Sequence, residues 1–505
     1  MVICMLAGVL CITAFAIDEP AEGTVLRVSA LKSDGSTEAI DDYDNFEDGW
    51  NAAMEFAANF KELSKKGYKR VVVDLCSDWE AVEGEFSDDL INGKGFNWDT
   101  IYFPAGVHVT LNLNGYTIDR GLEEYQYNGE VMYVDKNANV IINDGTITGG
   151  WSCNGAGGIH INDDANVTLN NVNLVGNVAE DDDGAAVAVY DGAKLIMNGG
   201  SISQNTVYNT TWLFLSLMGK ARGTIYVEDS EAIFKNVTIK ENVAKNGSSH
   251  GLVVYANNSS VVMEDCVVEE NGYVDDEKNY VSPLSFVYSE KNIDITFTNT
   301  KFLNNGDAKR NIKYGDTGGE EYSQTALMSY YSILSSNVHS AALTGCTVTG
   351  NNVDYLFDLA NVKFEMNDCT ITDNRAYAVY DRLYFAADCY AFPRNFQSCT
   401  FNNNIPEESV KRFCGKTELA TFAFYAEHAE IYFNNCEFGD STFLNKDYAH
   451  FSEDSSLATA SVFGEGSLTM IVSLLALIAS GVAIFLVVYY NKKKAVPATE
   501  TEDEE

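Results

Sequence analysis

Basic residues and proline are scarce in this chain of 505 residues, and each scarcity excludes a class of protein. Only 33 Lys and Arg stand against 73 Asp and Glu, which gives a formal net charge of −40. A surface this acidic repels phosphate and offers no basic stripe, so nucleic acid is excluded as a partner. Six prolines and 39 glycines exclude collagen-like and proline-rich chains. An apolar fraction of 46% predicts a large buried core rather than an acidic disordered chain.

Long hydrophobic runs are confined to the two ends of the chain. Residues 1–16 end in Ala-Phe-Ala, a small-x-small cleavage pattern, and predict a secretory signal peptide. They lack a basic segment at their start, so an N-terminal core strand is the alternative. Residues 468–490 carry no charge and are long enough to cross a bilayer as one helix, with a buried core helix as the alternative.

The charges beside the second run predict its orientation. Lys492–Lys494 follow the predicted membrane helix directly, and basic residues favour the cytoplasmic side. We therefore expect a single-pass cell-membrane protein, with its N-terminus outside the cell and an acidic tail, residues 491–505, in the cytoplasm. The membrane is then one predicted partner, reached through one helix.

Between the two ends, a segment of nine columns recurs eleven times. Columns one and six are always apolar, columns two and three are mostly Asn, Asp or Gly, and column nine is Asn in eight consecutive segments. The segments begin at Leu113, Ile142, Leu169, Met197, Phe234, Met263, Phe297, Leu343, Met366, Phe396 and Phe433, at spacings of 23 to 46 residues. No such unit buries its own apolar face, so neighbouring units must stack.

The columns predict the path of the backbone. Columns four and six share one face of an extended strand, whereas column one has the other parity, so a tight bend must lie between them. Asn, Asp and Gly tolerate the left-handed backbone angles of such a bend. Another short strand precedes many segments, as at residues 158–161, 186–189, 223–227 and 251–254. The pattern predicts an all-β fold, a parallel β-helix (solenoid) over residues 100–441.

The same residues resemble a known family. Phe302-x-x-Asn305 and Phe401-x-x-Asn404, with Gly-Gly-Ile at 157–159, are similar to the repeats of polymorphic membrane protein adhesins. More generally, they resemble pectin-lyase-like right-handed β-helix proteins. The resemblance covers roughly residues 100–441 and implies a right-handed β-helix in a cell-surface protein. Those adhesins have a different C-terminal segment, so their secretion route is not implied.

The regions beside the repeats complete the expected domain organisation. Residues 17–99 are predicted to be an N-terminal capping region, because apolar residues recur at helical spacing over 45–70 and a strand follows at Val71–Leu75. A helix here would cover the open end of a β-helix, and a partner-binding helix is the alternative. Residues 442–467 form a spacer before the membrane helix.

The sequence favours a membrane-anchored, adhesin-like scaffold that binds an extracellular glycan or protein, because repeats along a rod suit multivalent contact. A membrane-tethered polysaccharide lyase or glycoside hydrolase is the alternative, since right-handed β-helices often cleave polysaccharides. Its candidate residues, which are also a candidate Ca²⁺ site, are acidic clusters of the kind that solvated loops contain. The clusters are Asp41–Asp42, Asp163–Asp164, Glu180–Asp183 and Asp275–Glu277. No residue is assigned as catalytic and no organic cofactor is predicted.

Histidine, tyrosine and asparagine give further candidates. The six histidines have no metal-ligand spacing; they are His108, His160, His250, His339, His428 and His450. Three tyrosines lie eight residues before a repeat start, and they form either an outward stripe that stacks on glycans or part of the core: Tyr226, Tyr255 and Tyr425. Five sequons matter only in a eukaryotic secretory pathway; they begin at Asn166, Asn209, Asn236, Asn246 and Asn258.

Column four contains five cysteines, namely Cys266, Cys346, Cys369, Cys399 and Cys436. Because column four faces inward with column six, these side chains should form a buried stack with Cα atoms about 4.8 Å apart. Parallel Cβ atoms keep nearly that separation, whereas a disulfide needs about 3.8 Å. The alignment therefore predicts mostly reduced thiols that pack as small apolar groups. A linear stack also cannot surround zinc tetrahedrally.

Overall fold

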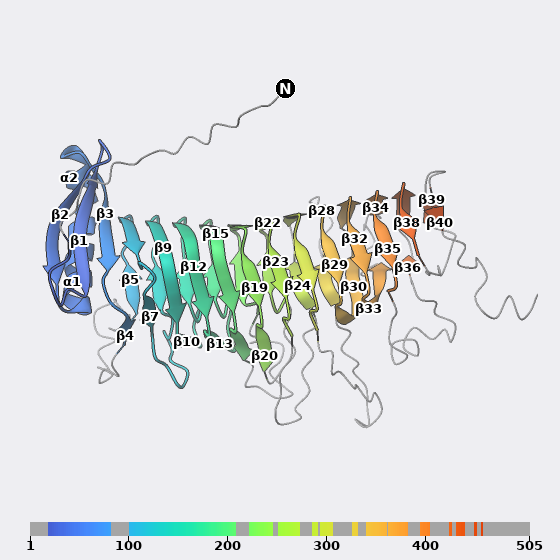
Figure 1. Ribbon diagram of the computed structural model, residues 1–505, viewed down its shortest axis with the longest axis horizontal. Coiled ribbons are helices and arrows are strands. Elements are labelled where there is room, and N and C mark those ends of the chain that lie inside the picture. Colours follow the sequence, from blue (N-terminus) through green and yellow to red (C-terminus); the bar gives the residue numbers. More distant parts are fainter. Residues whose placement is uncertain are drawn as a thin grey trace, which may run out of the picture.

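The computed structural model describes residues 19–81, 100–208, 222–245, 251–272, 285–290, 293–306, 326–331, 340–360, 362–381, 394–404, 424–426, 431–439, 449–451 and 456–457. In this part of the chain, short strands stack along one axis, and a unit with two helices lies at the N-terminal end (Figure 1). The predicted signal peptide, membrane helix and tail lie outside the described residues. None of the helices that are described is long and apolar enough to cross a membrane.

The strands form three sheets, which we call A, B and C. Within the described residues, sheet A has 25 strands. They are β1 (Leu26–Lys32), β2 (Thr37–Tyr43), β3 (Tyr68–Leu75), β4 (Trp79–Glu80), β6 (His108–Asn112), β7 (Thr117–Asp119), β9 (Asn139–Thr148), β12 (Asn166–Val175), β15 (Lys194–Ser203), β18 (Glu231–Lys235), β19 (Thr238–Lys240), β22 (Ser260–Glu264), β23 (Val267–Glu269), β25 (Asp294–Thr298), β26 (Lys301–Leu303), β28 (Ser340–Thr344), β29 (Thr347–Thr349), β31 (Lys363–Asn367), β32 (Thr370–Thr372), β34 (Arg394–Gln397), β35 (Thr400–Asn402), β37 (Ile431–Asn434), β38 (Glu437–Phe438), β39 (Ala449–Phe451) and β40 (Ser456–Leu457).

Sheets B and C complete the coils. Sheet B contains β5 (Ile101–Phe103), β8 (Met132–Val134), β11 (Ile159–Ile161), β14 (Val187–Val189), β17 (Ile225–Glu228), β21 (Val254–Asn257), β24 (Ser285–Glu290), β27 (Ala326–Tyr331), β30 (Asn352–Ala360), β33 (Arg375–Asp381) and β36 (Phe424–Ala426). Sheet C contains β10 (Trp151–Ser152), β13 (Val178–Glu180), β16 (Thr206–Tyr208) and β20 (Val243–Lys245). Each coil therefore supplies two or three short segments, as the repeat predicted.

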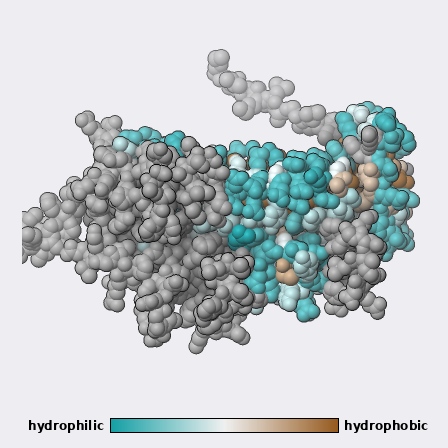
Figure 2. Space-filling model, turned by 180° about the vertical axis from the view of Figure 1, so that it is seen from behind, coloured by the Kyte–Doolittle hydropathy of each residue, from teal (hydrophilic) through white to brown (hydrophobic). Residues whose placement is uncertain are grey.

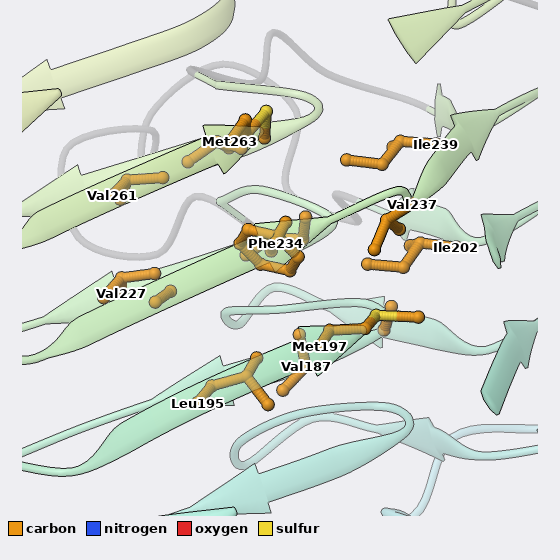
Figure 3. Packing of buried hydrophobic residues seen from close by; sticks show 14 of the residues in the cluster. Val187, Leu195, Met197, Ile202, Val227, Phe234, Val237, Ile239, Val261 and Met263 are labelled. Carbon is orange, nitrogen blue, oxygen red and sulfur yellow. The ribbon is translucent and has the colours of Figure 1, made fainter. Parts of the chain in front are cut away.

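Equivalent residues of successive coils pair in parallel and in register. Ile142 pairs with Leu169, and the same column continues through Met197, Phe234 and Met263. Figure 3 shows Met197, Phe234 and Met263 in one row of the interior, and all are fully buried. Burying such a side chain contributes roughly 1.5–3 kcal/mol. The prediction of an all-β parallel solenoid is confirmed.

The predicted bend falls at column three. Its residue has a positive φ in every coil from the second segment to the last: Asp144, Asn171, Gly199, Asn236, Asp265, Asn299, Gly345, Asp368, Ser398 and Asn435. Residues with short polar side chains, or with no side chain, adopt this region at the lowest cost, which explains the composition of the column. A second left-handed residue at column eight, such as Asn304, was not predicted.

The first repeat departs from its predicted alignment. Leu111, rather than Leu113, pairs with Ile142, so the bend of this coil is longer by two residues. Leu113 is nevertheless fully buried. Gly145 of the next coil makes room for it, because a Cβ atom at Gly145 would lie 2.3 Å from the Cβ of Leu113. Leu113 thus fills the place that column four fills in later coils.

Column nine forms a buried asparagine ladder that was not predicted. The side-chain amide and the backbone N–H of one Asn both donate to Oδ1 of the Asn in the next coil, as from Asn271 to Asn305 at 3.0 and 3.2 Å. The members are Asn177, Asn205, Asn242, Asn271, Asn305, Asn351, Asn374 and Asn404. Each amide also donates to a main-chain carbonyl, so these buried polar groups are satisfied.

Column four places its five cysteines inside the coils, each at most 1% exposed. All are free thiols. The backbone N–H of Cys346 donates to Sγ of Cys369 at 3.3 Å, and the thiol of Cys399 donates to the Met366 carbonyl at 3.4 Å. The predicted inward position of these five thiols is confirmed. Four of them come from consecutive coils and form the cysteine ladder: Cys346, Cys369, Cys399 and Cys436.

The N-terminal unit combines antiparallel strands with helices. Strand β1 pairs antiparallel with β2 and β3, and β3 continues in parallel to β6. The predicted helix is present as α1 (Phe46–Ala58) and α2 (Phe60–Lys65), divided at Asn59. The predicted strand at Val71–Leu75 is part of β3. The antiparallel pairing of β1 with β2 was not predicted.

Helix α1 is fixed over the first coils by its buried face. Asn45 caps the helix, because its side-chain oxygen accepts from the N–H of Asp48 at 3.0 Å. Trp50 Nε1 donates to the Tyr102 carbonyl at 3.2 Å, and its ring meets Phe103 edge-on at 5.0 Å.

The described surface is mostly hydrophilic on the face in Figure 2, where hydrophobic residues gather toward the N-terminal end.

Candidate functional site

The acidic run Glu180–Asp183 lies where the chain passes from sheet C to sheet B. Strand β13 ends at Glu180 and β14 begins at Val187. Asp181 and Gly184 both have positive φ, so the chain turns twice within four residues. The run contacts groups from the coils on both sides of it, which makes it the centre of the candidate site.

Asp183 is held by Arg222 of the next coil. Nε and Nη2 of Arg222 donate to the two carboxylate oxygens, each at 2.8 Å. The guanidinium also lies over the rings of Tyr226 and Tyr255, 5.0 Å from each centroid. Burial raises the pKa of Asp183 to about 7, although Arg222 opposes that shift. At 5% exposed, Asp183 ties two coils together and does not face solvent.

Glu130 is a second buried carboxyl in this region. It is 1% exposed, and its Oε2 has no hydrogen-bond partner among the described residues. Burial raises the pKa of Glu130 to about 7; Arg120 opposes this shift and Asp182 adds to it. Asp182 itself accepts from the N–H of Gly155 at 2.7 Å. Two carboxyl groups with a pKa near 7 therefore lie in this region, Asp183 within the acidic run and Glu130 beside it.

Aromatic rings border the run on the outward face of sheet C. Trp151 Nε1 donates to Oε2 of Glu180 at 2.7 Å, and the ring of Tyr208 meets Trp151 edge-on at 6.3 Å. Trp151 and Tyr208 are half-buried, whereas Ser152, the neighbour of Trp151, is fully buried. Because side chains alternate along a strand, Trp151 points away from the core.

Two exposed tyrosines extend this face by one coil. Gln126 forms a parallel bridge with Ser152, so the residues on either side of Gln126 lie beside Trp151 and Cys153. These residues are Tyr125 and Tyr127, which are 57% and 67% exposed. We call the following set the sheet C surface: Tyr125, Tyr127, Trp151, Glu180 and Tyr208.

Only Glu180 of the sheet C surface was predicted from the sequence. Trp151 and Tyr208 belong to strands of two and three residues, which are too short to show a period. The pattern Tyr-Gln-Tyr at 125–127 was the available signal, because two rings separated by one polar residue point to the same side of an extended segment.

Tyr226 and Tyr255 lie on sheet B, on the side away from the main core. Their rings stack with centroids 5.3 Å apart, within a row that includes Tyr190 and Tyr288. They are 0% and 3% exposed, and each covers a face of the other. These two rings are therefore buried by packing and do not form an exposed stripe for glycans, although they lie on the outward side of the sheet. The side chain of Tyr425 lies outside the described residues.

Two other predicted acidic clusters, Asp41–Asp42 and Asp163–Asp164, lie apart from this region. Asp42 pairs with Arg27 at 2.7 Å, and this hydrogen bond lowers the pKa of Asp42 below its ordinary value. Asp163 and Asp164 form a left-handed turn with φ of 41° and 59°. The cluster Asp275–Glu277 lies outside the described residues.

Histidine supplies no metal site in the described ranges. The ring of His160 stacks between Tyr133 and Tyr190 at 4.6 and 4.9 Å, and burial lowers its pKa to about 4. Burial also lowers the pKa of His108. His250, His339, His428 and the side chain of His450 lie outside those ranges. Among the residues within them, no group of three His, Cys, Asp or Glu is placed to hold a metal ion.

Three of the sequons can be placed. Asn166, Asn236 and Asn258 have exposed side chains, and the last two lie at left-handed turn positions. The sequons at Asn209 and Asn246 lie outside the described residues.

Comparison with known proteins bears on the fold. A family model described as "Right handed beta helix region" matches residues 111–282. Together with the parallel pairing of successive coils, that match decides the class. The chain is a parallel β-helix protein. No curated protein matches it. The matched range contains the whole sheet C surface of this β-helix protein, so the candidate site belongs to the repeat region itself.

Proposed function

We propose that the β-helix protein is an adhesin-like binding scaffold of the cell surface. The observation that carries this proposal is the sheet C surface, where exposed and half-exposed aromatic rings border a carboxylate over consecutive coils. Aromatic side chains with a polar end are typical of interfaces, because they combine contact area with hydrogen bonding. The ligand is an extracellular glycan or protein.

The proposal includes an anchor and a cap. Residues 468–490 anchor the protein in the membrane, residues 17–467 stand outside the cell, and residues 491–505 lie in the cytoplasm. The support is the uncharged run followed by Lys492–Lys494. Helix α1 caps the first coils, and the contacts of Trp50 with Tyr102 and Phe103 support that role.

A membrane-tethered polysaccharide lyase or glycoside hydrolase is the second candidate. Asp183 and Glu130 favour it, since carboxyl groups with a pKa near 7 suit general acid or base catalysis. Both groups are buried, however, and both oxygens of Asp183 accept hydrogen bonds from Arg222. The described geometry supports binding better than cleavage.

We expect the protein to bind without cleaving. The full chain, solubilised in detergent, is applied to glycan and protein arrays and is then incubated with pectin, alginate and a glycosaminoglycan. If the protein retains a ligand and releases no unsaturated or reducing ends from these polysaccharides, the result supports a binding scaffold. Release that disappears in Asp183→Asn or Glu130→Gln would establish the enzyme instead.

A further inference from the structure

The sheet C surface has the features of a site for a ligand with apolar faces and many hydroxyl groups. Tyr125 and Tyr127 flank Gln126, whose main chain bonds to Trp151 and Cys153 of the next coil at 2.9 and 3.1 Å. More than half of each ring side chain is exposed. Such a ring covers C–H groups with its face and forms hydrogen bonds through its hydroxyl group.

Polar groups beside the rings match a ligand of this kind. The amide of Asn154 donates to Oδ1 of Asn128 at 3.1 Å, and both residues lie next to the segment that carries Tyr127. The indole of Trp151 is fixed in place by Glu180. Amides form hydrogen bonds with hydroxyl groups without requiring the ligand to carry a charge. The indole N–H is taken by Glu180, so Trp151 contributes only its ring.

The charges of the region select against anionic ligands. The chain carries a net charge of −40, and the acidic run adjoins the rings, so a uronate or sulfated sugar is repelled. Arg222 does not compensate, because Asp183 binds it through two hydrogen bonds. Glu123 and Glu124, which precede Tyr125, are exposed and add to that repulsion, whereas Glu180 and Asp183 are 6% and 5% exposed.

We propose that the sheet C surface binds an uncharged oligosaccharide, with Tyr125 and Tyr127 stacked against sugar rings. This inference rests on the proposed function, because it names the class of ligand for that same surface. It sets the β-helix protein apart from a receptor for acidic polysaccharides. It also assigns the contact to one coil segment near the N-terminal end of the solenoid.

The test uses the full chain in detergent on an array of neutral, N-acetylated, amino, uronate and sulfated oligosaccharides. The strongest ligand is then titrated by calorimetry at low and at high salt. We expect retention of uncharged sugars, with an affinity that salt leaves nearly unchanged, since screening acts on charged pairs.

Variants locate the contact. Tyr125→Ala and Tyr127→Ala should each weaken binding about tenfold, as loss of an interface hot spot does. Tyr125→Phe, which keeps the ring, should retain most of the affinity. Tyr432→Ala is the matched control, because Tyr432 is 38% exposed in β37 of sheet A, and it should leave binding unchanged.

The outcomes separate the ligand class from the proposed function. If the protein prefers uronate, sulfated or amino sugars, or if these tyrosines bind only peptides, the proposal of an uncharged ligand is wrong. The proposed binding function then still holds. If neutral sugars bind a variant with both Tyr125→Ala and Tyr127→Ala as tightly as they bind the parent protein, the assignment of the site is wrong. If neither array retains the protein, both the ligand class and the binding function fail.

Discussion

Single buried carboxyl groups contribute a specific part of the pH response of this protein. Glu130 is 1% exposed, and one of its oxygens has no hydrogen-bond partner in the part of the chain that the structure describes. Desolvation penalises its charged form, so the folded state keeps the proton at a pH where the unfolded chain has lost it. The exposed carboxylates have no comparable penalty, since water solvates them in both states.

The sign of the pH effect follows from that shift. The pKa of Glu130 rises from 4.5 to about 7 on folding, so its contribution to stability is complete below pH 4.5 and is lost as the pH rises through 7. The loss amounts to about 3 kcal/mol. We expect Glu130→Gln, which cannot ionise, to flatten the dependence of the free energy of unfolding on pH between 5 and 8.

Denaturant titrations at several pH values measure this slope. Glu123→Gln is the control, because Glu123 is exposed in the same loop and its replacement should leave the parental slope unchanged. An unchanged slope in Glu130→Gln would show that Glu130 is ionised at neutral pH.

At the scale of elements, the two internal ladders explain how turns of unequal length keep one register. From Asn177 to Asn404, the asparagine ladder bonds each coil to the next through side chains, in addition to the main-chain pairing of the sheets. Each amide from Asn177 to Asn374 donates to a carbonyl of the preceding coil and to the Asn of the next coil. Removing one amide therefore leaves polar groups without partners in both neighbouring coils. The ladder thereby fixes the point at which each of these coils leaves sheet A, whatever loop follows it.

Replacing one member should therefore be costly. Asn305→Ala removes the acceptor for the N–H and amide of Asn271 and the donors to Val268 and Asn351. Buried groups left without partners cost roughly 1–3 kcal/mol each, so we expect a loss of about 3 kcal/mol or more in the free energy of unfolding. Asn402→Ala, at an exposed position of β35, should cost less than about 0.5 kcal/mol. Equal losses would show that the ladder adds nothing beyond main-chain pairing.

The cysteine ladder makes a chemical prediction. For Cys369, the hydrogen bond from Cys346 lowers the pKa, but the hydrogen bond with Cys399 and burial outweigh it and raise the pKa to about 12. Cys369 therefore carries little thiolate at neutral pH. The hydrogen bond from Cys399 lowers the pKa of Cys436, but all four thiols are inaccessible. We expect Cys346, Cys369, Cys399 and Cys436 to be labelled slowly in the native chain and quickly after denaturation without reductant.

Peptide mapping after alkylation distinguishes the ladder from the other cysteines. Cys76 and Cys153, which are partly exposed, provide the internal control and should react first. Recovery of the four ladder cysteines as disulfides would contradict the prediction.

At the scale of the whole molecule, the sequence predicts what repeats and misses what occurs once. The columns predict the solenoid because the same burial pattern returns in every coil, from Ile142 to Phe433. The pairing of β1 with β2 occurs once and leaves no period. Leu113 was assigned to the wrong column because an apolar residue suits either position. The candidate site lies outside the columns, in the short strands of sheet C and beside Gln126, so its rings carried no pattern beyond Tyr-Gln-Tyr.

The orientation of the whole chain is tested by proteolysis of intact cells. Protease should remove residues 17–467 and leave a fragment that contains residues 468–505 in the membrane, because Lys492–Lys494 favour the cytoplasmic side. Antibodies against each end identify the fragments, and detergent-permeabilised cells serve as the control. Digestion of the tail alone in intact cells would reverse the proposed orientation.

The unequal coils have a mechanical consequence. A rod held at a membrane and pulled at its far end carries tension through the hydrogen bonds between coils, and these bonds break one layer at a time from an end. Each layer then releases a length of chain set by its own residue count. The ladder separations of 46 residues from Asn305 to Asn351 and 23 from Asn351 to Asn374 correspond to about 160 and about 80 Å of extended chain. Force–extension traces of this protein should therefore carry a fingerprint in which the longest step adjoins the shortest.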